Sequence, residues 1–169
     1  MKPWKSKLTV MTVKVLKFIS ILVVALLAGT SFGIWMGLNP VAYSPSTYLE
    51  QQQNLVSSLN AMMVALVVLE TLVTIALAFR LRQNNTVFMA LLFAAACFAS
   101  CIFISRFGNL PIQKEMLTWD GASLPDHWTT RRDRWWFLHK LRTIAELAGL
   151  VLVTWTIIFR QETKPFGHS

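Results

Sequence analysis

Six residues of chemically useful types recur at helical spacing in the last third of the chain. In order they are Trp128, Arg132, Trp135, His139, Arg142 and Glu146. Steps of three and four residues return to one side of an α-helix, so these side chains form a single stripe. An imidazole can transfer protons near neutral pH, and a guanidinium can stabilise an oxyanion. We therefore interpret His139 and Arg142 as candidate catalytic residues and Glu146 as a supporting group.

The other three residues of the stripe are candidate substrate-binding residues. Indole and guanidinium planes stack on flat rings, so Trp128, Arg132 and Trp135 suit an aromatic or quinone-like ligand. A simpler interpretation is also open. Tryptophans gather at membrane interfaces, and Arg142 and Glu146 have the spacing of an ordinary helical ion pair.

The stripe runs into one of four apolar stretches, which define the fold class. The chain has 169 residues, of which 54% are hydrophobic and 14% are charged. A helix of about 20 apolar residues crosses the hydrocarbon of a bilayer. We expect one all-α integral membrane domain over residues 1–169, folded as a four-transmembrane-helix bundle. The expected spans are 18–36, 55–79, 84–105 and 143–159.

Helix-start signals lie well before the second and fourth spans. Thr47 and Glu50 have the spacing of a capping box. Ser123, Pro125 and Asp126 are typical of a helix N-terminus. Helices 2 and 4 are therefore predicted to extend beyond the external face of the membrane.

Basic residues are unevenly placed around the spans. Five lysines precede the first span and the loop 37–54 has no lysine or arginine, while the same side as the N-terminus also receives Arg80, Arg82, Arg160 and Lys164. The positive-inside rule then predicts a multi-pass protein of the bacterial inner membrane with both termini in the cytoplasm. A basic cluster between the third and fourth spans opposes this orientation and is thus a functional candidate. The net charge of +8 flanks apolar spans and suits anionic headgroups, so we expect membrane lipids as partners and no nucleic acid.

Small and sulfur-containing residues make further predictions about packing. Gly29, Gly33 and Gly37 recur every four residues, which predicts a close helix–helix contact. Cys97 and Cys101 lie one turn apart and are poorly placed for a disulfide. We expect them to be small residues at a helix interface, with a redox pair as the alternative. The histidines are scattered, and no metal site is predicted.

Two polar residues fall inside the second apolar stretch. Asn60 can hydrogen-bond to a neighbouring helix, or it can bind substrate near the external face. Glu70 lies near mid-bilayer, where a carboxylate needs a proton, a partner or a wet cavity. Either Glu70 is protonated and hydrogen-bonded to Thr71, Thr74 or another helix, or it handles protons in support of function.

A second motif lies just past the third span and completes a pattern with the stripe. It comprises Asn109, Pro111, Ile112 and Gln113, and it is followed by Trp128, Trp135, His139 and then Arg142-Thr143. This combination resembles the anthrone oxygenase-like family of small four-helix membrane proteins, many of which are known only as a domain of unknown function. The family pattern is N-x-P-small apolar-N, then W-x6-W, an Asn or His, and R-T. The chain departs from it by having Gln113 in place of Asn, and His139 where many members have Asn.

The resemblance implies oxygenase-like chemistry on a membrane-soluble aromatic or quinol-type substrate. Some fungal relatives oxidise anthrones to anthraquinones with molecular oxygen and without an established cofactor. Such a reaction needs a base that creates an electron-rich carbanion or phenolate. His139 would serve as that base while Arg142 and Asn109 stabilise the oxyanion. Gln113 would bind substrate beside them, together with Asn60.

Two other functions remain open from the sequence. A non-enzymatic protein could bind a lipid or a partner through the stripe, which would then face lipid or water. A proton-coupled carrier could use Glu70, which would then adjoin a cavity. An enzyme predicts a closed pocket on which Asn109, His139 and Arg142 converge. The cofactor requirement stays open, and a homo-oligomer is compatible with the chain.

Overall fold

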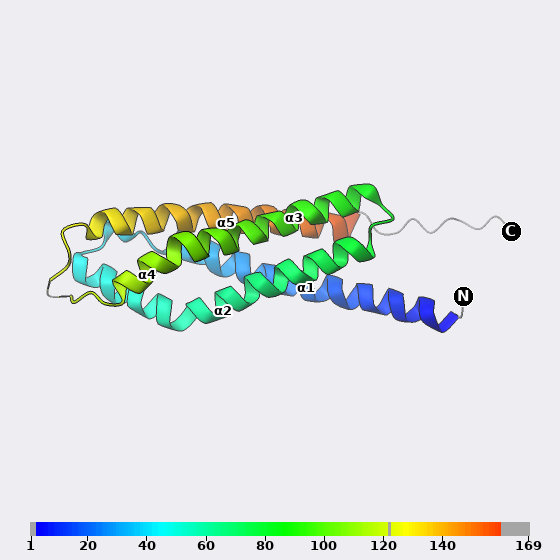
Figure 1. Ribbon diagram of the computed structural model, residues 1–169, viewed down its shortest axis with the longest axis horizontal. Coiled ribbons are helices and arrows are strands. Elements are labelled where there is room, and N and C mark those ends of the chain that lie inside the picture. The colour runs from blue at the N-terminus through cyan, green and yellow to red at the C-terminus, as the bar shows by residue number, and fades with distance from the viewer. Residues whose placement is uncertain (1–2, 122, 160–169) are drawn as a thin grey trace.

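The structure is a computed structural model that describes residues 3–121 and 123–159. Within these residues the chain is all-α, and four long helices run side by side in an antiparallel bundle (Figure 1). The helices are α1 (Pro3–Gly37), α2 (Pro45–Arg80), α3 (Asn85–Ile104) and α5 (Trp128–Phe159). A 3₁₀ turn, η1 (Pro40–Ala42), connects α1 to α2. A π-helical turn, η2 (Ser105–Asn109), continues α3 into the short helix α4 (Leu110–Met116).

Four helical stretches are long and apolar enough to cross a membrane. They are Val10–Ala42, Pro45–Arg80, Asn85–Met116 and Trp128–Phe159. Large apolar side chains point outward from several of them, including Phe18, Phe93 and Val151. Outward-facing apolar side chains are what lipid contact requires of a spanning bundle. The chain is therefore a multi-pass membrane protein with the predicted four-helix fold.

Two apolar clusters hold the bundle together. The first joins all four long helices and includes Leu27, Leu77, Leu91, Phe98 and Val153. The second lies at the end of the bundle that carries η1, α4 and the loop 117–127, here called the loop-bearing end. It is rich in aromatic side chains, including Tyr48, Trp119 and Trp135, and it also contains Met116. Three buried polar residues of α5, His139, Thr143 and Glu146, lie in the sequence between Trp135 and Val153, and so between the two clusters.

The starts of α2 and α5 differ from those predicted. Ser44 caps α2, since its hydroxyl accepts the Thr47 N–H at 3.3 Å, and Pro45 occupies the first turn. The predicted capping box at Thr47 is thus wrong, because a serine followed by proline starts the helix earlier. The predicted start at Ser123 is also wrong, since Ser123 pairs with Asp120 in an isolated β-bridge and α5 begins at Trp128. Both helices still extend beyond the spans 55–79 and 143–159 at the same end of the bundle (Figure 1).

The third helix continues past Ser105, where it was predicted to end. Pro111 has no N–H and would disturb a regular α-helix at this point. The backbone accommodates it with the π turn, in which the Leu110 N–H bonds to the Ser105 carbonyl five residues back. Asn109 consequently lies in a helix and is buried, whereas the sequence placed it in a loop.

The predicted glycine contact in the first span is wrong. Gly29, Gly33 and Gly37 are exposed, and a Cβ atom added at any of them would meet nothing within 4 Å. The opposite side of α1 packs instead, through residues that include Leu27 and Ser31. The close approach occurs at Gly149 of α5, where an added Cβ would lie 2.4 Å from Cζ of Phe98 on α3.

We expect Gly149→Ala to destabilise the bundle, because the rigid Phe98 ring would have to move. Overpacking of this kind costs about 1–3 kcal/mol. Thermal unfolding of the purified protein in detergent measures the effect, with Gly33→Ala as the matched control on an open helix face. Equal melting temperatures for the two variants would contradict this packing.

Candidate polar site inside the bundle

The predicted stripe of α5 faces the interior of the bundle. Trp135, His139 and Glu146 are buried, and the same helical phase continues through the buried residues Gly149, Val153 and Thr156. The side chains of Arg132 and Arg142 are mostly covered as well. A stripe that served only to contact lipid or water would be exposed, so its burial favours an internal site.

An internal cavity of about 20 Å³ lies between α1, α2, the π turn, α4 and α5, with Leu27 as the residue of α1 in its lining. Its volume is enough for about one water molecule. Its polar lining consists of Asn60, Ser105, Asn109, Gln113, Arg142 and Glu146. All of these except Ser105 were singled out from the sequence. The fold therefore brings together five predicted residues that are separated by up to 86 positions in the chain, from Asn60 to Glu146.

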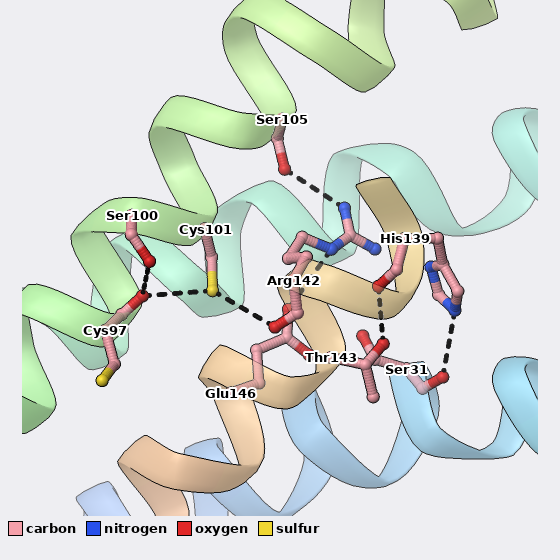
Figure 2. Close-up of polar contacts among 9 residues, drawn as sticks. All are labelled: Ser31, Cys97, Ser100, Cys101, Ser105, His139, Arg142, Thr143 and Glu146. Carbon is pink, nitrogen blue, oxygen red and sulfur yellow. Dashed lines mark hydrogen bonds and ion pairs between the residues drawn. The ribbon is translucent and has the colours of Figure 1, made fainter. Parts of the chain in front are cut away.

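Arg142 is the charged centre of this cavity. Its Nε lies 3.4 Å from Oε1 of Glu146, one turn along α5, and its Nη1 donates to the Ser105 hydroxyl at 3.2 Å (Figure 2). Removal of two charges from water is unfavourable unless they pair and gain hydrogen bonds. The carboxylate provides the ion pair and the serine hydroxyl provides a hydrogen bond to Nη1, whereas Nε of Arg142 has no hydrogen-bond partner in the described part of the chain.

Several buried polar atoms in the cavity have no hydrogen-bond partner. Both amide atoms of Asn109 and Oε2 of Glu146 are unpartnered in the described part of the chain. Each of these residues is only 1% exposed. Buried polar groups are nearly always hydrogen-bonded, so such a cluster indicates that a water or a ligand group occupies the space. The amide can donate and accept, and the carboxylate oxygen can accept a proton.

His139 is buried but does not line this cavity. Its Nε2 donates to the backbone carbonyl of Ser31 on α1 at 3.2 Å, and its ring stacks on Trp135 at 5.3 Å. Figure 2 shows the imidazole directed toward α1 while Arg142 reaches toward the end of α3. Residues three apart on a helix differ by about 60° in direction, so they can face different neighbours. Asn109 and Arg142 therefore line one cavity, and His139 lies outside its lining.

The residues predicted to stack on substrate stack on one another. The Arg132 guanidinium lies 5.0 Å from the Trp128 ring centroid and pairs with Asp133 at 2.9 Å. Trp128 in turn packs 5.7 Å from Tyr48 of α2. Trp135 belongs to the same aromatic cluster. These residues cover the loop-bearing end of the bundle and are not among the residues that line the cavity.

Glu70 forms a separate polar centre. Its Oε1 accepts hydrogen bonds from Ser20 of α1 at 2.6 Å and from Thr74 at 2.9 Å. The internal cavity is lined by Val67 but not by Glu70. The sequence allowed either hydrogen bonding of Glu70 to Thr74 or another helix, or a role of Glu70 in proton handling. The observed contacts match the first arrangement, and they do not connect Glu70 to the internal cavity.

Sequence reasoning missed Ser105 and the role of Cys101. Ser105 lies one turn before Asn109, and that spacing was the signal that could have found it. The Cys101 thiol contacts the Cys97 carbonyl at 3.2 Å and the Arg142 carbonyl at 3.5 Å, so it packs α3 against the backbone of the site. Both cysteines are free. Among the described residues no group of three or more His, Cys, Asp or Glu side chains could hold a metal ion.

The family model for anthrone oxygenase matches residues 53–152. The chain belongs to this family. The match confirms the resemblance that Asn109, the two tryptophans and Arg142 indicated. The matched range of the anthrone oxygenase family contains every polar residue of the cavity lining, whereas α1 lies outside it. No curated protein and no solved structure matches the chain.

We expect the Arg142–Glu146 pair to show strong coupling in a double-mutant cycle. Arg142→Met or Glu146→Leu alone leaves one uncompensated buried charge, which typically costs about 3–5 kcal/mol. The double variant removes both charges and should be clearly more stable than the sum of the two losses predicts. Unfolding free energies in detergent test this expectation, and strictly additive losses would contradict it.

Proposed function

We propose that this protein is a membrane oxidoreductase of the anthrone oxygenase type, which oxidises a hydrophobic aromatic or quinol-type substrate with molecular oxygen. The observation that carries the proposal is the set of unpartnered atoms of Asn109 and Glu146 beside the Arg142 guanidinium. A proton acceptor and two kinds of hydrogen-bond donor thus meet in one small, largely buried cavity. Electrostatic groups act most strongly where water is excluded.

The chemistry that suits these groups is proton abstraction followed by reduction of oxygen. Oε2 of Glu146 takes a proton from a carbon next to an aromatic carbonyl, or from a phenol. Arg142 and the Asn109 amide stabilise the oxyanion that forms. The resulting electron-rich carbanion or phenolate reduces oxygen. For a methylene substrate, CH₂ and O₂ give C=O and H₂O, so the balance requires no further reductant.

In this proposal Glu146 takes the role of base that the sequence suggested for His139. A carbonyl oxygen only accepts hydrogen bonds, so the Ser31 contact places a proton on Nε2 of His139. His139 instead has a positioning role, since it joins α1 to α5 one turn from Arg142. Trp135 and Trp136 hold the imidazole plane in place by stacking at 5.3 and 5.5 Å.

We expect Glu146→Gln and Arg142→Lys to lower the rate of anthrone or hydroquinone oxidation by about 10²–10⁴-fold, the usual effect of removing a general base or an oxyanion donor. His139→Asn should retain most of the rate, because an amide can still donate to Ser31. Quinone absorbance, followed in membranes that carry each variant, provides the measurement.

Arg134→Lys is the matched control, since Arg134 is an exposed arginine of the same helix. If parent membranes oxidise neither substrate class, the proposed function fails. If Glu146→Gln turns over like the parent while His139→Asn does not, the base is assigned to the wrong residue.

We infer that both termini face the cytoplasm of a bacterial inner membrane, with membrane lipids around the bundle. Support comes from the lysine-rich N-terminus and from the placement of the start of α1 and the end of α5 at the same end of the bundle (Figure 1). The internal cavity then lies toward the outer leaflet.

Cysteine labelling tests this orientation in a background that lacks Cys97 and Cys101. An impermeant maleimide should label Thr118→Cys in intact cells, since Thr118 is exposed near the loop-bearing end. Gln83→Cys, which is exposed at the opposite end, should react only after permeabilisation. The reverse pattern would overturn the orientation.

A further inference from the structure

The internal cavity is far too small for an aromatic substrate in the conformation described. It holds about 20 Å³, whereas pockets for small organic ligands span about 300–1,000 Å³. If the cavity is the substrate site, as the proposed function requires, one of its walls must move. The structure points to which wall this is.

A surface notch of about 400 Å³ lies directly outside the cavity. It is lined by Arg106, Leu110, Pro111 and Lys114, on one side of the π turn and α4. Leu110 also lines the internal cavity. One leucine therefore forms a common wall between the notch and the site.

The larger groove between α1 and α2 does not have this relationship to the site. Its volume is about 770 Å³, and its walls include Gly33 and Ile34 of α1 and Gln51 of α2. It shares no lining residue with the internal cavity. By volume the groove would be the better entrance for a substrate. The notch is the better candidate because it shares Leu110 with the internal cavity.

The notch is cationic, and an aromatic pair lies next to one of its two cations. Arg106 and Lys114 are exposed one turn before and one turn after Leu110, and neither pairs with a carboxylate in the described part of the chain. The Arg106 guanidinium lies 5.7 Å from the exposed ring of Phe107, which packs on Phe103 at 4.7 Å. In contrast, Arg131 is partly neutralised by Glu115 at 3.0 Å. Two cations without carboxylate partners at the notch attract an anion; the aromatic ring of that anion is what the proposed function requires.

The backbone beneath Leu110 suits movement. Leu110 directly follows the π turn, and Pro111 lacks an N–H, so this segment departs from regular α-helical hydrogen bonding. π turns of this kind occur frequently at functional sites. A rotamer change of Leu110, with small adjustment of this segment, would join the notch to the cavity.

We propose that the notch is the entrance through which an acidic aromatic substrate reaches the internal cavity, with Leu110 as its movable wall and Arg106 and Lys114 as the residues that select negative charge. The proposal rests on the proposed function only in taking the cavity as the substrate site. The substrate class is thereby narrowed to membrane-soluble aromatics that carry a carboxylate or a phenolate.

The test follows chemical access to the cavity and needs no turnover. Asn60→Cys places a thiol in the cavity lining, in a full-length chain whose Cys97 and Cys101 are replaced by alanine. Two aromatic disulfides report its reaction rate by absorbance. One is 5,5′-dithiobis(2-nitrobenzoic acid), which is anionic, and the other is the neutral 4,4′-dithiodipyridine. Ser58→Cys, in the groove between α1 and α2, is the matched control reporter.

We expect Leu110→Trp to slow both reagents at Asn60→Cys by about tenfold or more, and Leu110→Ala to accelerate both, because the wall becomes larger or smaller. Arg106→Gln with Lys114→Gln should slow the anionic reagent by about tenfold, since local charge raises association rates by at least this factor. The neutral reagent should be unaffected by that change. The Ser58→Cys rates should not respond to any of these variants, and Arg134→Gln should leave both reporters unchanged.

The proposal is overturned if neither Leu110 variant changes the Asn60→Cys rates, or if neutralisation of Arg106 and Lys114 slows both reagents equally. The two Leu110 variants act in opposite directions, so a general loss of stability cannot imitate the expected result. If access behaves as expected while no anthrone or hydroquinone is oxidised, the entrance stands and only the proposed function fails.

Discussion

The buried ion pair between Arg142 and Glu146 is the constraint on which the rest of the structure depends. Two charges inside a membrane-spanning bundle must find partners within the protein, since lipid offers none. Glu146 pairs with the guanidinium at 3.4 Å, and Ser105 adds a hydrogen bond from the end of α3. The pair thus requires α3 and α5 to stay in register, and it creates a polar pocket where a bundle of this size would otherwise be apolar.

Three packing features maintain that register. Gly149 lets the Phe98 ring approach α5 closely below the pair, while the Cys101 thiol contacts the Arg142 carbonyl beside it. Above the pair, Trp135 and the neighbouring aromatic residues close the loop-bearing end of the bundle. The π turn before Pro111 changes the helical phase so that Asn109 points into the space that remains. A regular helix would place this amide elsewhere, because one extra residue per turn rotates all that follows.

The proposed function rests on the incomplete hydrogen bonding of this pocket. A protein that only needed stability would satisfy every buried polar atom or replace it with an apolar group. Here Asn109 and Glu146 keep free acceptor and donor atoms beside a guanidinium, all within the range that matches the anthrone oxygenase family. The reaction that we propose, proton abstraction with stabilisation of an oxyanion, would use all three groups. The notch outside Leu110, which we propose as the entrance, would give a negatively charged substrate a route to these groups.

The sequence by itself determined the four apolar helices, the family and the inward face of the α5 stripe, because apolar runs and helical periodicity are local properties. It also identified Asn60, Asn109 and Gln113 as companions of that stripe. Only the tertiary structure decided which neighbour each side chain meets. His139 and Arg142 share a stripe, yet one contacts α1 and the other reaches Ser105, because a helix in a bundle packs against two others at once. The glycines behave in the same way. Their spacing on α1 shows that they share one face of the helix, but that face is open, and the close contact is made by Gly149 with Phe98. Only the packing of the helices determines what a face of small residues meets.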